Sequence, residues 1–126
     1  MPIVRVTRRA GRPAGENARV LTAVHDALVE AFRIAETDRT QILCELNPAS
    51  LELPPDRTPA FALVEISAFP GRSADAKRAL YAGIARRLEA IGIPPADVFV
   101  VLAEPPLENW SVRNGRSAAD GRAGPR

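Results

Sequence analysis

Residues 61–102 read FALVEISAFPGRSADAKRALYAGIARRLEAIGIPPADVFVVL, and this stretch decides the fold. Residues 61–67 and 98–102 are apolar runs rich in β-branched side chains, which are typical of strands. Between them Ser73 is placed as a helix N-cap and Gly92 as the end of that helix. Apolar residues recur between these two positions at helical spacing: Leu80, Ile84, Leu88 and Ile91. The stretch therefore predicts a strand, a helix and a second strand.

The first half of the chain has the same order of elements. Residues 2–7 predict a strand, and residues 8–15 predict a loop because they are rich in Gly and Pro. Residues 17–32 carry apolar side chains at helical spacing, and residues 38–46 return to strand character. Residues 47–59 hold four prolines, which predicts a non-helical connector.

The two halves together predict one α/β domain of the two-layer α+β type. Ile3 and Phe61, which stand at equivalent places, are 58 residues apart. This offset indicates two β-α-β units, roughly residues 2–46 and 60–103, within a domain over residues 2–112. Two such units give a four-stranded sheet with both helices on one face. Residues 113–126, rich in Arg and Gly, are expected to be a disordered tail.

Two helices on one face leave the other face of the sheet uncovered. The run over residues 98–102 is apolar on both sides, so we expect an uncovered apolar face. Self-association is the simplest way to bury such a face, and a closed homo-oligomer is predicted. The alternative is that the Pro-rich connector and the C-terminal segment fold back over it.

Composition and charge narrow the possible functions. The net charge of the 126 residues is +2, but residues 113–126 carry +3 and the rest −1, so we expect no nucleic-acid partner. No apolar stretch reaches about 18 residues, so no membrane span is predicted and the cytoplasm is the expected location. One histidine and one cysteine, Cys44, provide no metal set, and no cofactor is expected.

Pro2 follows Met1 directly, and an initiator Met before Pro is normally removed. Removal would leave a free secondary amine at the start of a strand. An α-amino group has an ordinary pKa of about 8, so it can serve as a base, an acid or a nucleophile near neutral pH. The alternative is that Pro2 only starts the strand, since it lacks a ladder donor.

Arg72 lies in a Pro-Gly turn directly before the Ser73 cap. A guanidinium beside the free N–H groups of a helix start suits a carboxylate ligand. The alternative is a solvated arginine beside an ordinary helix cap.

These residues resemble the tautomerase superfamily, which is built from β-α-β units and uses an amino-terminal proline. The resemblance rests on the Met1-Pro2 start, residues 71–75, Asp97 before an apolar strand, and residues 104–110. It covers roughly residues 2–115 and implies a homotrimer. Residues 24–32, followed by Asp38 and Arg39, are most similar to the malonate semialdehyde decarboxylase branch.

The resemblance implies a role for each site residue. Pro2 matches the catalytic amine, Asp38 a residue that assists it, and Arg72 the carboxylate-binding arginine. Trp110 matches the pocket wall, and His25 a substrate-binding histidine of dehalogenase relatives. Structural roles remain open for three of these residues. His25 could be a core residue, Asp38 a turn residue and Trp110 a residue that only packs the C-terminal segment.

One position departs from the pattern of these relatives. The decarboxylases and dehalogenases carry a second arginine where this chain has Ala68 or Phe69, and Phe69 favours a less polar ligand.

The expected function is keto-enol proton transfer on a small 2-oxo or enol carboxylic acid. The first alternative is decarboxylation or hydration of a 3-oxo acid such as malonate semialdehyde. The second is a non-catalytic trimeric binding or scaffold protein, which the missing second arginine favours. Nucleic-acid contact through the Arg-rich tail is a further option, although that tail has no aromatic residues to stack bases.

Overall fold

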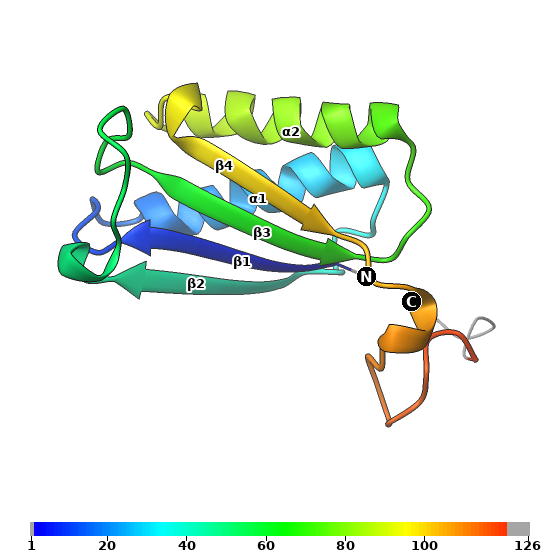
Figure 1. Cartoon of the computed structure of the whole chain (residues 1–126). Helices are drawn as coiled ribbons and strands as arrows, with labels where there is room; N and C mark the ends of the chain where they lie inside the picture. The colour runs from blue at the N-terminus through cyan, green and yellow to red at the C-terminus, as the bar shows by residue number, and fades with distance from the viewer. Residues whose placement is uncertain (1, 121–126) are drawn as a thin grey trace.

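The computed structural model describes residues 2–120, which form a four-stranded sheet with two helices above it (Figure 1). In chain order the main elements are β1 (Pro2–Arg9), α1 (Glu16–Phe32), β2 (Thr40–Leu46), β3 (Ala62–Ala68), α2 (Ala74–Glu89) and β4 (Val98–Ala103). Three short 3-10 helices lie in the connections: η1 (Pro48–Ser50), η2 (Pro95–Asp97) and η3 (Leu107–Asn109). The two predicted β-α-β units are confirmed, and both helices cover the same face.

The strand order is β2-β1-β3-β4. Each unit contributes one parallel pair, β1 with β2 and β3 with β4, while β1 and β3 run antiparallel at the centre. In that central pair Pro2 lies opposite Ala68, and Arg8 lies opposite Ala62. The start of β1 is therefore beside the end of β3, and the start of β3 is at the other end of the sheet.

The core lies between the sheet and the two helices. Alternate residues of β1 and β3 point toward the helices and are buried, as the two-residue period of a strand requires. The helices contribute apolar side chains on their sheet-facing sides. The most deeply buried side chains from the four elements include Val4, Val6, Val20, Val24, Leu28, Val64, Leu80, Ile84 and Leu88.

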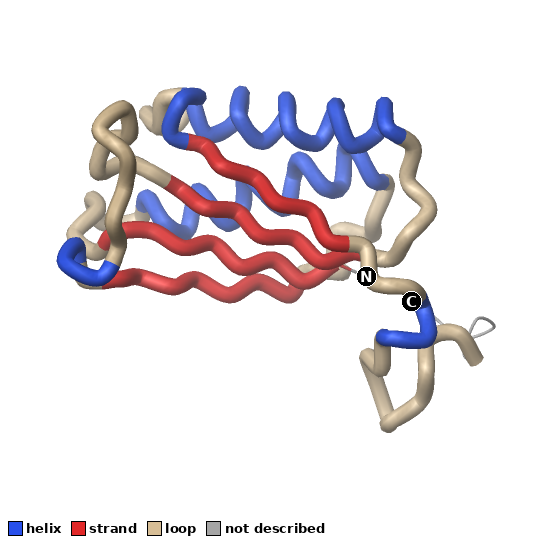
Figure 2. The backbone as a smooth tube through the Cα atoms, viewed as in Figure 1, coloured by secondary structure: helices blue, strands red, loops and turns tan. Residues whose placement is uncertain are grey.

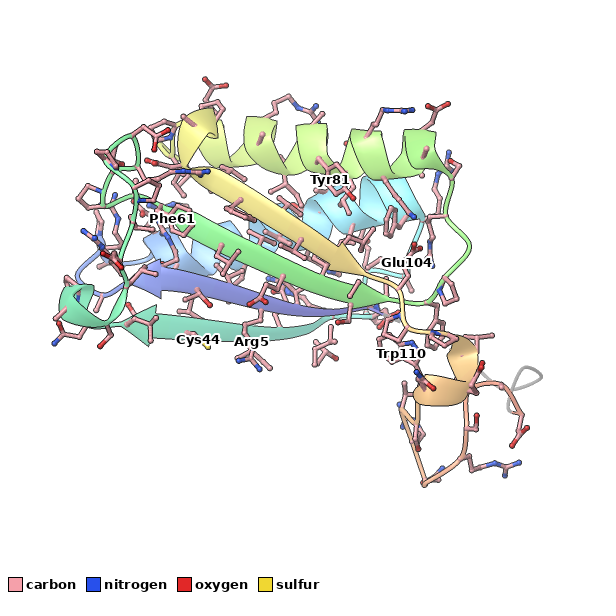
Figure 3. All side chains as sticks on the ribbon, in the orientation of Figure 1. Arg5, Cys44, Phe61, Tyr81, Glu104 and Trp110 are labelled. Atoms are coloured by element: carbon pink, nitrogen blue, oxygen red, sulfur yellow. The ribbon has the colours of Figure 1, made fainter. Side chains whose placement is uncertain are left out.

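The opposite face of the sheet is open to solvent and partly apolar. Ile3, Ile42, Phe99 and Val101 are 38–46% exposed, although the guanidinium of Arg57 in the connector lies 5.6 Å from the centre of the Phe99 ring. The same face also carries charge, because exposed Arg5 and Glu65 lie opposite each other in the β1–β3 register. Figure 3 shows Arg5 and Cys44 projecting away from the helices. The predicted uncovered face is present, with a charged pair in its centre.

The start of α2 forms as the sequence predicts. The Ser73 hydroxyl accepts a hydrogen bond from the Ala76 amide at 3.1 Å, so the predicted N-cap is confirmed. The helix ends at Glu89, and Gly92 follows with a φ of +107°, a left-handed conformation that favours glycine. By contrast, α1 begins after Gly15 with no side-chain cap.

Two segments differ from the sequence prediction. Strand β1 continues through Arg9, although residues 8–15 predicted a loop, because the Arg8 side chain is wholly buried and bonded. Residues 113–120 form turns instead of the expected disorder, and the Ala118 amide donates to the Trp110 carbonyl at 2.9 Å. Figure 2 shows the chain after β4 passing through the short helix η3 before it continues as loop and turn. The rest of the predicted tail, residues 121–126, lies outside the described residues.

Within residues 2–120 no helix is long and apolar enough to cross a membrane. The same residues contain no group of three or more His, Cys, Asp or Glu that could hold a metal ion.

Candidate active site

Pro2 is the first residue of β1 and is buried on the helix-facing side of the sheet. The register places Ala68 directly opposite it, and Ala68 is also buried. The nitrogen of Pro2 therefore lies where the central strand β1 begins and β3 ends. A reactive group at this place would have its backbone fixed by the sheet.

Asp38 belongs to the loop between α1 and β2, at the same end of the sheet. Thr40 lies opposite Ile3, so Asp38 is two residues outside the pairing and close in register to the start of β1. Its amide donates to the Ala35 carbonyl at 3.0 Å, and its side chain is half-buried. The loop thus brings a carboxylate to the end of the sheet where Pro2 lies.

Arg72 lies in the loop that leads from β3 to α2. Its Nη1 donates to the carbonyl of Phe69 at 3.3 Å, and its Nη2 to the carbonyl of Phe32 at 3.4 Å. The guanidinium carbon also lies 4.9 Å from the centre of the Phe32 ring. These contacts fix the guanidinium next to the residue that follows Ala68, and it makes no ion pair within residues 2–120. Its charge is therefore available to an anionic ligand.

Phe69 and Trp110 form an aromatic pair beside this loop. Their ring centres are 5.1 Å apart and the rings are nearly perpendicular, an arrangement that aromatic rings favour. The indole Nε1 donates to the carbonyl of Pro105 at 3.0 Å. The pair therefore attaches the segment after β4 to the end of β3, and Figure 3 places Trp110 just beyond the strands.

His25 is on α1 and only 4% exposed. Its Nε2 lies 2.9 Å from the carbonyl oxygen of Glu36, so this nitrogen carries the proton and donates. Glu36 belongs to the loop that carries Asp38. The contact that the structure gives His25 is thus with the backbone of that loop.

Two polar residues at this end were not selected from the sequence. Glu104 follows β4 directly, and its Oε1 lies 2.5 Å from Nζ of Lys77 on α2. The pair is 27 residues apart in the chain and on two different elements. No periodicity links the two residues, so only the fold brings them together.

Asp97 is also held by the fold. The backbone amide of Thr58 donates to its Oδ1 at 2.9 Å, and the Thr58 hydroxyl donates to its Oδ2. Both contacts lie at the start of β4, the opposite end of the sheet from Pro2. Asp97 therefore fixes the connector and is not part of the candidate site.

The candidate site residues come from four separate connections and strand ends that meet at one end of the sheet: Pro2, Asp38, Phe69 with Arg72, and Trp110. Together they provide a buried strand start, a carboxylate, a guanidinium without an ion pair in residues 2–120, and an aromatic pair. Such a set can bind a small carboxylic acid and move a proton.

Comparisons with known proteins identify tautomerases among the relatives of this chain. Two curated relatives from Bacillus subtilis (strain 168), "Probable tautomerase YusQ" and "Probable tautomerase YrdN", are each 28% identical to this chain. Both alignments cover 93% of this chain, and they cover 97% and 95% of the respective relative.

The solved structures that this chain resembles include a malonate semialdehyde decarboxylase inhibited by 3-bromopropiolate. It is 28% identical, with a TM-score of 0.85, over 96% of this chain and 95% of that one. A second structure of malonate semialdehyde decarboxylase, which concerns its decarboxylase and hydratase activities, is 29% identical with a TM-score of 0.85. This match covers 95% of this chain and 98% of that one. A fused 4-OT, solved as a symmetric trimer, is 28% identical with a TM-score of 0.82, over 93% and 96%.

A family model described as "Tautomerase enzyme" (Tautomerase_2) matches residues 38–113. This match spans more than half of the chain and includes the loop of Asp38, the turn of Arg72 and the segment of Trp110. The protein therefore belongs to the tautomerase enzyme family, with malonate semialdehyde decarboxylases among its structural relatives.

Proposed function

We propose that this protein catalyses keto-enol proton transfer on a small 2-oxo or enol carboxylic acid, with the amine of Pro2 as its catalytic group. The observation that carries the proposal is the β1–β3 register, in which Pro2 lies opposite Ala68 and hence next to the turn of Arg72. The proposal requires removal of Met1, since only an amino-terminal proline has a basic nitrogen.

Each neighbouring residue has a defined part in the proposed reaction. Arg72 binds the substrate carboxylate and stabilises the negative charge that develops on the enolate. Asp38 assists the amine, and Phe69 with Trp110 forms an apolar wall. We assign His25 a supporting part, because its hydrogen bond to Glu36 holds the loop of Asp38.

The reaction then needs only one proton carrier. The neutral Pro2 amine removes a proton from the enol oxygen or from carbon, and becomes a cation. It returns a proton to the other position and regains its neutral form. An α-amino group with an ordinary pKa of about 8 can populate both forms near neutral pH.

Decarboxylation or hydration of a 3-oxo acid is the second candidate. The two malonate semialdehyde decarboxylases with TM-scores of 0.85 favour it. In that case the cationic form of Pro2 acts as an acid. The family resemblance implies a second arginine at the position of Ala68 or Phe69, and the apolar residue that stands there favours the less polar ligand of the first candidate.

We also propose that three copies of the chain associate through the open face of the sheet. The exposed apolar residues Ile3, Ile42, Phe99 and Val101 support this, as does the symmetric trimer of the similar fused 4-OT. The proposed location is the cytoplasm, with neither nucleic acid nor a membrane as a partner. A trimer without catalytic activity would retain this assembly and lack the amine.

The test compares wild type with Pro2→Ala in the ketonisation of phenylenolpyruvate. The change leaves a primary amine without the ring that fixes its position. Misplacing a reacting group by about 1 Å can cost about 100-fold, so we expect kcat/KM to fall by about 100-fold. Intact mass must first show that Met1 is absent from both proteins. Pro54→Ala, in the exposed connector, is the matched control and should keep wild-type activity.

Three outcomes would contradict the proposal. Equal rates for wild type and Pro2→Ala would show that the secondary amine of proline is not required. Retention of Met1 would favour the non-catalytic trimer. Turnover of malonate semialdehyde without any ketonisation would favour the decarboxylase candidate.

A further inference from the structure

The carboxylate of Glu104 has one oxygen held by the protein and one oxygen without a partner. Oε1 forms the ion pair with Lys77, in which the two side chains are only 20% and 29% exposed. Oε2 is buried and accepts no hydrogen bond from residues 2–120. Buried polar atoms in folded proteins almost always have a partner, so this oxygen requires an explanation.

The fold places Glu104 in the same row as Pro2. Ser67 lies opposite Ala103, and Ala68 lies opposite Pro2, so Glu104 and Pro2 stand on either side of Ala68. Their backbones are two strand spacings apart, roughly 10 Å. Figure 3 shows Glu104 at the end of β4.

Glu104 and Pro2 also share one side of the sheet. Pro2 is buried on the helix-facing side, and Glu104 contacts Lys77, which belongs to a helix on that side. The residue between them, Ala68, has only a methyl side chain. A small acid bound at this end of the sheet could therefore contact both residues.

We propose that Oε2 of Glu104 accepts a hydrogen bond from a hydroxyl group of the ligand, and so selects enol or hydroxy acids over acids that lack the hydroxyl. The inference rests on the proposed function and names a further specificity-determining residue for that site. An ionised carboxylate is only an acceptor, so its partner must be a donor. The substrate carboxylate itself cannot serve, because the two negative groups repel, and it is bound by Arg72.

Lys77 determines the direction of this contact. Its ammonium group holds Oε1, which leaves Oε2 as the oxygen directed to the ligand. Hydrogen bonds to charged groups are stronger than neutral ones, and a ligand that leaves a buried acceptor unpaired binds correspondingly more weakly. The enol form of a 2-oxo acid carries such a hydroxyl, whereas its keto form does not.

The experiment measures the dissociation constants of two acids that differ by one hydroxyl, phenyllactate and phenylpropanoate. Wild type without Met1 should bind phenyllactate about tenfold more tightly or better. Glu104→Leu, which has similar size and no acceptor, should reduce this preference to less than about threefold while still binding phenylpropanoate. Retained binding of phenylpropanoate shows that the pocket of the variant is folded.

Glu30→Leu is the matched control. Glu30 also forms ion pairs with basic residues of α2, Arg86 and Arg87, but on the exposed side of the helices. It should keep the tenfold preference of wild type.

The two proposals fail in different ways. If wild type catalyses ketonisation but binds phenyllactate no more tightly than phenylpropanoate, only the role of Glu104 is overturned. The same conclusion follows if Glu104→Leu keeps the preference of wild type for phenyllactate. Binding of neither acid together with no ketonisation overturns the proposed function and this inference with it.

Discussion

The two ends of the sheet contain similar polar groups in very different states. At the end where β3 begins, the Arg8 guanidinium is completely buried and each of its nitrogens donates a hydrogen bond, to Glu16, Asn17, Ala60 and Phe61. At the end where β1 begins, Arg72 has two long bonds to carbonyls, and one oxygen of Glu104 has no partner in the described chain. At the first end the Arg8 guanidinium is held from all sides, although Nε of Arg9 and Nη1 of Arg57 nearby are buried without a partner in residues 2–120. At the second end the unpartnered atom is an acceptor, Oε2 of Glu104.

The repeat makes these two ends equivalent in position. Helix α1 begins at Glu16 and α2 at Ala74, and strand β2 begins at Thr40 and β4 at Val98, so both offsets are 58 residues. The same offset places Ala60 at the position equivalent to Pro2. Ala60 is inside the chain, so its nitrogen is part of a peptide bond and is not basic. Its carbonyl oxygen accepts a hydrogen bond of 2.7 Å from Nη2 of Arg8. The repeat therefore gives two equivalent positions, Pro2 and Ala60. At Ala60 the carbonyl is bonded to Arg8, which also forms a buried ion pair with Glu16.

The largest expected effect on stability is that of Arg8→Met. This change leaves the carboxylate of Glu16 buried with only Arg12 as a charged partner. Loss of one member of a buried ion pair costs about 3 to 5 kcal/mol of unfolding free energy, which urea denaturation followed by circular dichroism measures. Arg78→Met, which breaks the exposed pair with Asp75, should change stability by less than about 1 kcal/mol. Equal losses in both variants would show that the buried ion pair of Arg8 contributes no more stability than an exposed one.

Arg72→Met should reduce activity strongly and stability only slightly, the reverse of what we expect for Arg8→Met. Charge-assisted bonds to a substrate carboxylate contribute about 1.5 to 3 kcal/mol, so kcat/KM for ketonisation should fall by about tenfold to 100-fold. Stability should change by about 1 kcal/mol or less, because the lost contacts are the stacking on Phe32 and two long hydrogen bonds. A large loss of stability with unchanged activity would make Arg72 another structural arginine.

The smallest expected effect is a pH dependence at the Arg8 end. Burial raises the pKa of Glu16, but hydrogen bonds from Arg12 and Arg8 and their positive charges lower it more, so the net pKa is below the ordinary 4.5. The unfolded chain then binds more protons than the folded one. This stabilisation is present above about pH 4.5 and is lost as the pH falls through the lowered pKa of the folded state.

Thermal denaturation midpoints between pH 7 and pH 3 test this. The midpoint of wild type should fall more steeply below about pH 4.5 than that of Glu16→Gln, whose side chain does not titrate. Identical slopes for the two proteins would mean that Glu16 contributes nothing to acid sensitivity.

Sequence patterns predicted the elements that depend on local periodicity. The apolar stripe of α2, its Ser73 cap and the strands of both units follow from spacing alone, because each feature is encoded within a few residues. Pro2 and Arg72 could be selected because each stands in a recognisable local context, a chain start and a helix start. Their placement at one end of the sheet required the antiparallel β1–β3 pairing, which no local pattern encodes.

Contacts between distant residues were not predictable in this way. Arg8 stands in a stretch rich in Arg, Gly and Pro that indicates a loop, yet it bonds the carbonyl of Ala60, 52 residues away. Lys77 and Glu104 meet across 27 residues. A charged side chain is normally solvated, so only the fold can reveal that it is buried and paired.

The antiparallel pairing of β1 and β3 also has a consequence for protein engineering. A circular permutant opened before Ala60, with the present ends joined by a linker, would begin two residues before β3, at the position equivalent to Pro2 but at the far end of the sheet. Its new terminal nitrogen would meet a guanidinium that already donates to four partners. Moving the proposed catalytic nitrogen to that end would therefore require replacing the arginine first.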